Sequence, residues 1–173
     1  MPTGRLELQG RRLQLLSTSL TRRLYDRTAP FYSLSTLLFH TRAHRLALEL
    51  AGSLEGQTVL EVAIGSGELF CELVSRNQAG LTAGVDLSPG MITVVRKRLN
   101  GNGTRNGHRP GRCLLEAVDA RKMPFADGMF DSLFNCYLFE LLQPADIEGT
   151  MREFHRVLRP GGKLLLVNIS DRS

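Results

Sequence analysis

From residue 57 onward, short apolar runs alternate with segments in which apolar residues recur at helical spacing. This alternation is typical of β-α-β units, in which a helix connects each strand to the next strand of a parallel sheet. It predicts strands at residues 58–63, 81–86, 113–118, 130–135 and 163–169. We therefore expect a doubly wound α/β fold with a mainly parallel sheet and helices on both faces.

Turn-forming residues and helix caps delimit the elements between these strands. Ser88 as N-cap and Pro89 at the first helical position predict a helix over residues 89–99. Pro144 begins a second helix, which the turn at residues 159–162 stops before the fifth strand. Two stretches rich in turn formers predict loops, at residues 100–112 and 120–129.

The positive charge of the chain is concentrated ahead of the sheet. Residues 1–56 carry eight arginines and four acids, whereas residues 57–173 carry fourteen basic and thirteen acidic residues. We assign residues 1–56 to an N-terminal helical lid and substrate segment, with one helix at residues 35–51, and residues 57–173 to the core. The leucines of the first part recur at helical spacing beside arginines, at positions 13, 16, 20 and 24. Such a basic amphipathic helix either packs on its own domain or contacts a membrane surface or an anionic partner.

The composition excludes several other classes of protein. The sequence contains no run of 18 or more apolar residues and no signal-peptide layout, so we expect a cytoplasmic protein, with peripheral membrane contact through the basic helix left open. Its three cysteines lack CxxC spacing, which argues against a disulfide framework and a zinc site. His40 and His44 stand four residues apart but lack a third ligand, so we expect no metal.

The first predicted strand runs into the glycine turn Gly65-Ser66-Gly67, which brings bare backbone close to a ligand, as in Rossmann-like folds. A dinucleotide-binding turn requires a third small residue where Phe70 stands, and a phosphate-binding Walker loop requires a lysine that is absent. Asp86 follows Gly65 by 21 residues, at the place where an acid can accept both hydroxyls of a ribose.

Acids stand at the ends of the first three predicted strands, at Glu61, Asp86 and Asp119. Any one of them alone reads equally well as a turn or cap residue. Three carboxylates together would repel a diphosphate and attract a sulfonium cofactor that carries an ammonium group. With the glycines, they favour S-adenosylmethionine over a nicotinamide dinucleotide.

Four segments, at residues 59–68, 84–91, 118–125 and 158–164, resemble in order the motifs of class I S-adenosylmethionine-dependent methyltransferases. The wording is closest to the branch of the ubiquinone and menaquinone C-methyltransferases and the phosphatidylethanolamine N-methyltransferases. Residues 25–32 also resemble the aromatic segment that precedes the core in that branch. The resemblance covers residues 57–169.

The resemblance implies a cofactor site in which Glu61 and the backbone of the glycines hold the methionine part and Asp86 the ribose. Met91 or its neighbours would face the adenine, and Asp119 with Ala120 would lie at the adenine edge. The whole implied set is Glu61, Ala63, Gly65, Gly67, Asp86, Leu87, Met91, Asp119 and Ala120. Ala63 departs from the pattern, because a glycine is common there.

Methyl transfer is an in-line displacement, so the enzyme mainly aligns the acceptor, and no catalytic residue is obligatory. Tyr25, Tyr137 and Glu140 are candidate bases on the acceptor side, each of which can equally be a surface or packing residue. The resemblance implies a small-molecule or lipid-like acceptor of the quinone or phospholipid class. Nucleic acid is disfavoured because the core is nearly neutral. The alternatives are a cofactor-binding protein without full activity and a nicotinamide-dependent oxidoreductase.

The chain stops at Ser173, whereas class I methyltransferases normally continue with a helix and a closing pair of antiparallel strands. We therefore expect a fold truncated after the fifth strand, with the N-terminal helices as a lid. An exposed sheet edge favours a homodimer or covering by the N-terminal helices.

Overall fold

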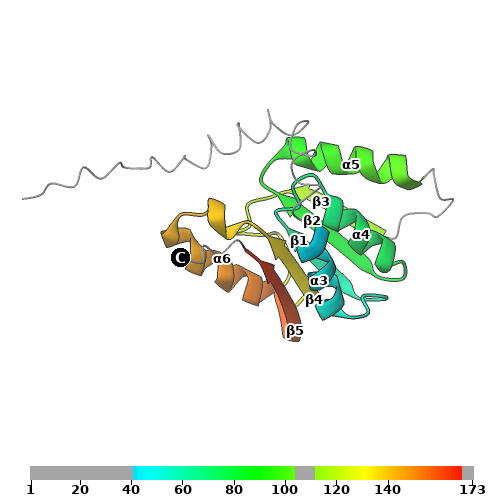
Figure 1. The fold of residues 1–173 in the computed structure, drawn as a ribbon. Helices are drawn as coiled ribbons and strands as arrows, with labels where there is room; N and C mark the ends of the chain where they lie inside the picture. Colours follow the sequence, from blue (N-terminus) through cyan, green and yellow to red (C-terminus); the bar gives the residue numbers. More distant parts are fainter. Residues whose placement is uncertain (1–40, 104–111, 169–173) are drawn as a thin grey trace, which may run out of the picture.

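The computed structural model describes residues 41–103 and 112–168, which form a five-stranded sheet in the order β3-β2-β1-β4-β5 (Figure 1). All four strand pairs are parallel. The strands are β1 (Thr58–Val62), β2 (Leu81–Asp86), β3 (Arg112–Ala117), β4 (Phe130–Cys136) and β5 (Leu158–Val167). The helices are α3 (Thr41–Ala51), α4 (Glu68–Arg76), α5 (Pro89–Gly103), the short η1 (Phe139–Leu141) and α6 (Pro144–Val157). The predicted doubly wound α/β fold is confirmed.

Helices cover both faces of the sheet. On one face, α3 and α4 pack against β1 and β4 through Leu48, Leu73 and Phe134. On the other face, α6 packs through Phe154 on the alternate side chains of the same strands, such as Leu60. Side chains alternate between faces along a strand, so each central strand contributes to both clusters.

Two element boundaries differ from the prediction by more than two residues. The helix expected at 89–99 continues to Gly103, so the first residues of the expected loop are helical. Its amino end agrees with the prediction, since the Ser88 hydroxyl accepts the Met91 amide at 3.2 Å. Apolar spacing ends at Leu99, but the helix extends beyond it, starting with the exposed Asn100 and Gly101. The sequence gives no signal there.

The second difference is at β5, which begins at Leu158 rather than at 163. Leu158 pairs with Phe130 and Lys163 with Ser132, so the predicted turn lies inside the strand as an irregularity. Gly161 adopts φ of 77° in that turn, which a residue without a Cβ tolerates. The predicted turn is thus confirmed. The residues before it form part of β5 because they pair with β4, which the local sequence does not indicate.

Helix α3 confirms the carboxyl-terminal part of the helix expected at 35–51, of which residues 35–40 lie outside the described residues. Its residues Ala47 and Ala51 are buried in the same cluster as β1. The Lys163 ammonium donates to the Ala51 carbonyl at 2.8 Å. These contacts attach α3 to the sheet. Across the described ranges, no helix is long and apolar enough to cross a membrane.

The position that departs from the dinucleotide pattern has a structural partner. Phe70 is fully buried on α4 and lies over Gly84 of β2. A Cβ at Gly84 would lie 2.6 Å from Phe70 Cε2 and 3.0 Å from Leu115 Cδ2. The large residue on the helix is therefore accommodated because the strand lacks a side chain beneath it.

Replacement Gly84→Ala is expected to destabilise the fold by about 1–3 kcal/mol, the usual cost of overpacking a filled core. The loss should be smaller in a Phe70→Leu background, since the shorter side chain leaves room for the added methyl. Urea unfolding of the four proteins measures this coupling.

The matched control is Gly149→Ala in α6, where a Cβ meets nothing within 4 Å. It should be neutral or stabilising by up to about 1 kcal/mol. Equal losses from Gly84→Ala in both backgrounds would show that Phe70 is not the constraint.

Candidate functional site

The candidate site lies at the carboxyl edge of the sheet, where the order of strands reverses. From β1 the chain proceeds to β2 and β3 on one side, whereas β4 and β5 follow on the other side of β1. Ligands of open α/β sheets bind at such a switch point, outside the carboxyl ends of the strands. All the implied cofactor residues follow β1, β2 or β3 or lie within their last two positions, apart from Met91 in the first turn of α5.

In the turn that follows β1, three residues at alternate positions have positive φ. The φ angles are 60° at Ala63, 51° at Gly65 and 80° at Gly67. A residue with a side chain is destabilised by about 1–2 kcal/mol at these left-handed backbone angles. Glycine would therefore suit position 63 better than the alanine found there. The departure noted in the sequence is thus a strained residue.

The two glycines of this turn have different functions. A Cβ at Gly67 would lie 2.5 Å from Val95 Cγ2, so Gly67 permits close packing of α5. A Cβ at Gly65 would meet nothing within 4 Å. Gly65 therefore presents its backbone to open space on the ligand side.

Asp86 joins the turns after β1 and β2. One carboxylate oxygen accepts the Gly65 amide at 2.9 Å and the other accepts the Ser88 amide at 2.9 Å. The backbone carbonyl of Asp86 accepts the Val118 amide at 2.8 Å, which ties in the chain after β3. One residue thus fixes three strand ends.

Glu61 is buried, with 3% of its surface exposed, near the carboxyl end of β1. Its Oε2 has no hydrogen-bond partner among the described residues. Burial raises the pKa of Glu61 well above its usual value, and the neighbouring Glu68 and Asp86 raise it further. A buried carboxyl with an unused oxygen is costly, and it fits a ligand that brings a cation or a donor.

Glu68, at the start of α4, is neutralised by neighbours that the sequence analysis did not identify. Arg98 of α5 forms an ion pair with Glu68 Oε1 at 2.9 Å, and the Ser66 hydroxyl donates to Glu68 Oε2. Arg98 reaches Glu68 only because α4 and α5 are neighbours in the fold.

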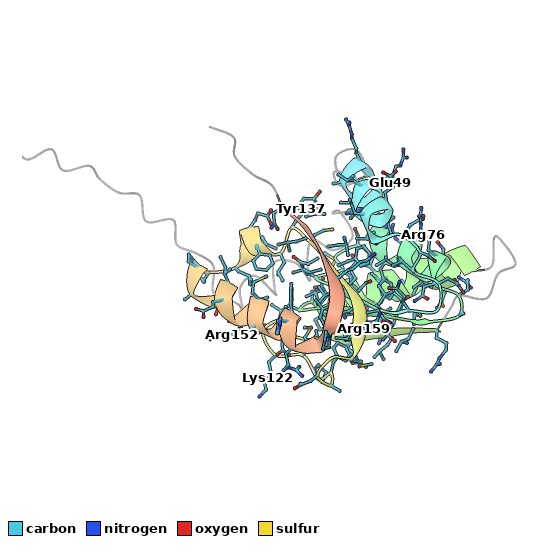
Figure 2. All side chains as sticks on the ribbon, turned by 90° about the horizontal axis from the view of Figure 1, so that it is seen from below. Glu49, Arg76, Lys122, Tyr137, Arg152 and Arg159 are labelled. Carbon is cyan, nitrogen blue, oxygen red and sulfur yellow. The ribbon has the colours of Figure 1, made fainter. Side chains whose placement is uncertain are left out.

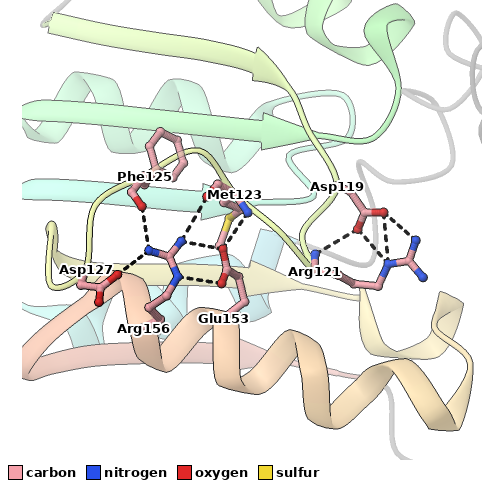
Figure 3. Close-up of polar contacts among 7 residues, drawn as sticks. All are labelled: Asp119, Arg121, Met123, Phe125, Asp127, Glu153 and Arg156. Carbon is pink, nitrogen blue, oxygen red and sulfur yellow. Dashed lines mark hydrogen bonds and ion pairs between the residues drawn. The ribbon is translucent and has the colours of Figure 1, made fainter.

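Asp119 is also paired. Arg121 donates to it from its backbone amide at 2.9 Å and from its guanidinium at 2.6 Å (Figure 3). The Arg121 guanidinium also forms an ion pair with Asp146 at 3.1 Å. The side-chain hydrogen bond from Arg121 lowers the pKa of Asp119. The three strand-end acids therefore do not act as one unscreened negative cluster, and Glu61 with Asp86 carries the electrostatic argument.

The loop that carries Asp119 and Ala120 is anchored to α6. Arg156 donates to the Phe125 and Met123 carbonyls at 2.8 and 3.1 Å, and Glu153 accepts the Met123 amide at 2.6 Å (Figure 3). These bonds hold a loop of irregular backbone in one position. Sequence reasoning had located the loop but not its anchor.

The remaining implied cofactor residues differ in exposure. Leu87 and Ala120 are half-buried at the edge, whereas Met91 is fully buried in the first turn of α5. Met91 thus lies inside the helix packing rather than on an open surface.

Two polar residues lie at the carboxyl end of β4, one within the strand and one just after it. Asn135 is fully buried, donates to the Val62 carbonyl at 2.9 Å and has no partner for its Oδ1 among the described residues. It was missed, although an asparagine within an apolar strand was a readable signal. Tyr137 follows with φ of 62°, and its amide donates to the Val167 carbonyl at 2.8 Å.

Tyr137 lies close to α3. Its ring centroid is 6.4 Å from that of His44, and burial, assisted by Cys136 and Glu140, raises its pKa. A tyrosine with a raised pKa is a hydrogen-bond donor at neutral pH. Glu140 is exposed on η1, and Tyr25 lies outside the described residues.

Known protein families and curated relatives are similar to this chain in sequence. Residues 59–162 match the family described as methyltransferase domain. A ubiquinone/menaquinone biosynthesis C-methyltransferase of a Geobacter species is 30% identical over 86% of this chain and 63% of its own length. A demethylmenaquinone methyltransferase of Thermus thermophilus is 31% identical over 83% of this chain and 63% of its own length. The chain spans less than two thirds of the length of these curated relatives.

Solved structures agree at the level of the fold. A methyltransferase from Aquifex aeolicus described as SAM-dependent superposes with a TM-score of 0.61 at 22% identity, covering 91% of this chain and 78% of its own. A methyltransferase from Methanococcus maripaludis described as putative and S-adenosylmethionine-dependent gives 0.67 at 16% identity, covering 82% and 62%.

The family match extends over more than half of the chain, and it begins in β1 and ends in the turn before Lys163. These are the first and last of the four motifs recognised in the sequence. The chain belongs to the class I S-adenosylmethionine-dependent methyltransferases, near the branch of the ubiquinone and menaquinone C-methyltransferases.

Proposed function

We propose that this protein transfers a methyl group from S-adenosylmethionine to a small-molecule, lipid-like acceptor of the quinone class. The single observation that carries the proposal is the buried Glu61 with an unused oxygen, in the strand that leads into the turn with open space at Gly65. The quinone class is supported by the names of the curated relatives, among them a 2-phytyl-1,4-naphtoquinone methyltransferase of a Nostoc species, 30% identical over 87% of this chain.

The residues at the carboxyl edge fit such a cofactor. Glu61 would face the ammonium group, the Gly65 backbone would lie against the methionine part, and Asp86 would accept from the ribose hydroxyls. The adenine would lie among Leu87, Asp119 and Ala120, with the buried Met91 behind them, and Ala63 would allow close approach at the strand end. The cofactor supplies an activated methyl on a sulfonium, whose leaving group is a neutral thioether.

A nicotinamide dinucleotide fits the same edge less well. Its diphosphate would approach Glu61 and Asp86, and the helix that receives it begins with Glu68 rather than with an unopposed amino terminus. The oxidoreductase alternative is therefore disfavoured.

The protein's own part in the reaction is alignment and exclusion of water. Tyr137 donates a hydrogen bond to the acceptor, Asn135 offers a carbonyl oxygen near the same strand end, and Glu140 or Tyr25 accepts a proton from it. Residues 1–56 form the lid and substrate segment over the core at 57–173. We place the protein in the cytoplasm, peripheral to the membrane and without a nucleic acid partner.

The outer edge of β5 supports a homodimer as a second proposal about assembly. Within the described part of the chain, β5 pairs only with β4, and Leu166 is 41% exposed. Open edges of this kind pair with other strands. Light scattering of the full chain tests this directly.

Replacement Glu61→Gln is expected to weaken S-adenosylmethionine binding by about tenfold or more, since it removes the charge that opposes the ammonium. The same variant should stabilise the free protein at pH 8 by about 1 kcal/mol or more, because it removes a buried ionisable group. Calorimetric titration and thermal unfolding measure the two effects.

The control is Glu72→Gln on the exposed side of α4, where Glu72 pairs with Arg76 at 2.7 Å. It should leave binding unchanged. Full affinity in Glu61→Gln would contradict the assigned position of the ammonium.

Cofactor affinity is expected to rise with pH in the window above the ordinary glutamate pKa of about 4.3. In the free protein the pKa of Glu61 is raised, so the carboxyl binds a proton there; a cationic ligand favours the ionised form and releases that proton. The free fold, in contrast, loses stability as pH rises through the raised pKa. Titrations in buffers of different ionisation enthalpy count the proton released.

Glu61→Gln should show no such proton release within the same window. If proton release persisted unchanged in that variant, another group would be responsible.

Methyl transfer itself is tested with a reduced short-chain naphthoquinone as acceptor, with S-adenosylhomocysteine and methylated product measured together. Tyr137→Phe should lower kcat by about tenfold or more while cofactor affinity stays unchanged, because only the acceptor loses a donor. Cofactor binding without turnover on quinone, phospholipid, phenol and amine acceptors would favour a binding protein over an enzyme.

A further inference from the structure

Helix α3 has two apolar faces, and only one is used by the fold. Ala47, Leu48 and Ala51 pack against the sheet. On the opposite side, Leu46 and Leu50 stand one helical turn apart and are 55% and 66% exposed. Singly exposed leucines are common on protein surfaces, but two in adjacent turns of one helix form a continuous apolar stripe.

Charged side chains flank this stripe. Arg42 and Arg45 are exposed and stand three residues apart, at a spacing that shares one side of a helix. Glu49, labelled in Figure 2, is exposed on the same helix and is the acidic residue near them. Neither arginine forms an ion pair with any residue in the described ranges. We call Arg42, Arg45, Leu46, Glu49 and Leu50 the outer face of α3.

The same helix reaches the candidate site. His44, between the arginines, lies with its ring centroid 6.4 Å from that of Tyr137, at the acceptor side of the sheet. One end of α3 is thus next to the place where the acceptor would react. Whatever contacts the outer face lies within one helix diameter of that place.

We propose that the outer face of α3 lies against an anionic lipid surface, from which a lipid-like acceptor reaches the site beside Tyr137. The second part rests on the proposed function, whereas the first does not. The leucines would enter the boundary between headgroups and acyl chains, and the arginines would contact the headgroup anions while their stems cover the apolar surface.

The size of the apolar stripe distinguishes a lipid surface from a protein partner. Two leucines offer far less area than the roughly 800 Å² per partner of a stable protein interface. An interfacial helix needs only a small apolar edge with basic residues beside it, and further affinity can come from anionic lipid. The two arginines, which have no ion-pair partner in the part of the chain that the structure describes, complement such a surface in charge.

The test is flotation of the full chain with vesicles of equal parts phosphatidylglycerol and phosphatidylcholine, and with vesicles of phosphatidylcholine alone. Binding is expected only to the anionic vesicles. The double variant Leu46→Ser, Leu50→Ser and the double variant Arg42→Gln, Arg45→Gln should each lower the partition coefficient by about tenfold. Glu49→Gln should raise it, since it removes the only acid of the outer face.

Two control variants match these changes away from the outer face. Leu114→Ser changes a leucine that is 36% exposed on β3, at the opposite edge of the sheet, and Arg152→Gln changes an exposed arginine of α6. Both should bind vesicles like the unaltered protein. Thermal unfolding and light scattering of all variants accompany the flotation.

Each alternative occupant gives a different result, and each overturns the proposal. If residues 1–40 of the chain cover the leucines, the leucine variant loses thermal stability and vesicle binding does not change. If a second copy of the chain covers the leucines, the leucine variant instead shows a lower molecular mass in light scattering. Equal flotation of the outer-face and control variants also overturns it, whereas loss of flotation with unchanged S-adenosylmethionine binding separates this proposal from the cofactor site.

Discussion

The carboxylate of Asp86 is the interaction on which the arrangement of the site depends. Backbone amides at tight turns after parallel strands cannot find partners in the sheet ladder and must be satisfied elsewhere. Asp86 accepts two of them, from Gly65 and Ser88, and its backbone accepts a third from Val118. Three strands therefore end in fixed positions relative to one another, and the Gly65 backbone is held by Asp86 where a Cβ would meet nothing within 4 Å.

Charge around this centre is distributed unevenly. Arg98 and Arg121 offset Glu68 and Asp119, whereas no described cation lies in an ion pair with Glu61. A buried, unpaired acid lowers the stability of the free fold, since its charge must be either neutralised by a partner or suppressed by a raised pKa. The two arginines confine that cost to the single carboxyl that a cationic ligand can relieve. Glu61 therefore lowers the stability of the free fold, while it serves the proposed cofactor site.

The sequence was sufficient for the layout but not for the side-chain pairing. Alternating apolar runs located all five strands, and Ser88 located a helix start, because both signals are local. The second ion pair of Arg121, with Asp146 in addition to Asp119, depends on where α6 begins, and the extension of α5 beyond Leu99 has no apolar pattern. Positive φ at Ala63 and Tyr137 could not be read either, since both residues ordinarily avoid it.

Unpartnered buried oxygens alone would not have located the site, as Asn77 demonstrates. Its Oδ1 also lacks a partner, at the opposite edge of the sheet, where its amide donates to the Gln57 carbonyl at 2.9 Å. A Cβ at Gly80 would lie 2.3 Å from that oxygen, so no ligand atom can approach from there. At Gly65 the corresponding space is empty. An unsatisfied group is therefore a useful indicator of a binding site only together with open space, and among the described residues the turn four residues after Glu61 offers such space at Gly65.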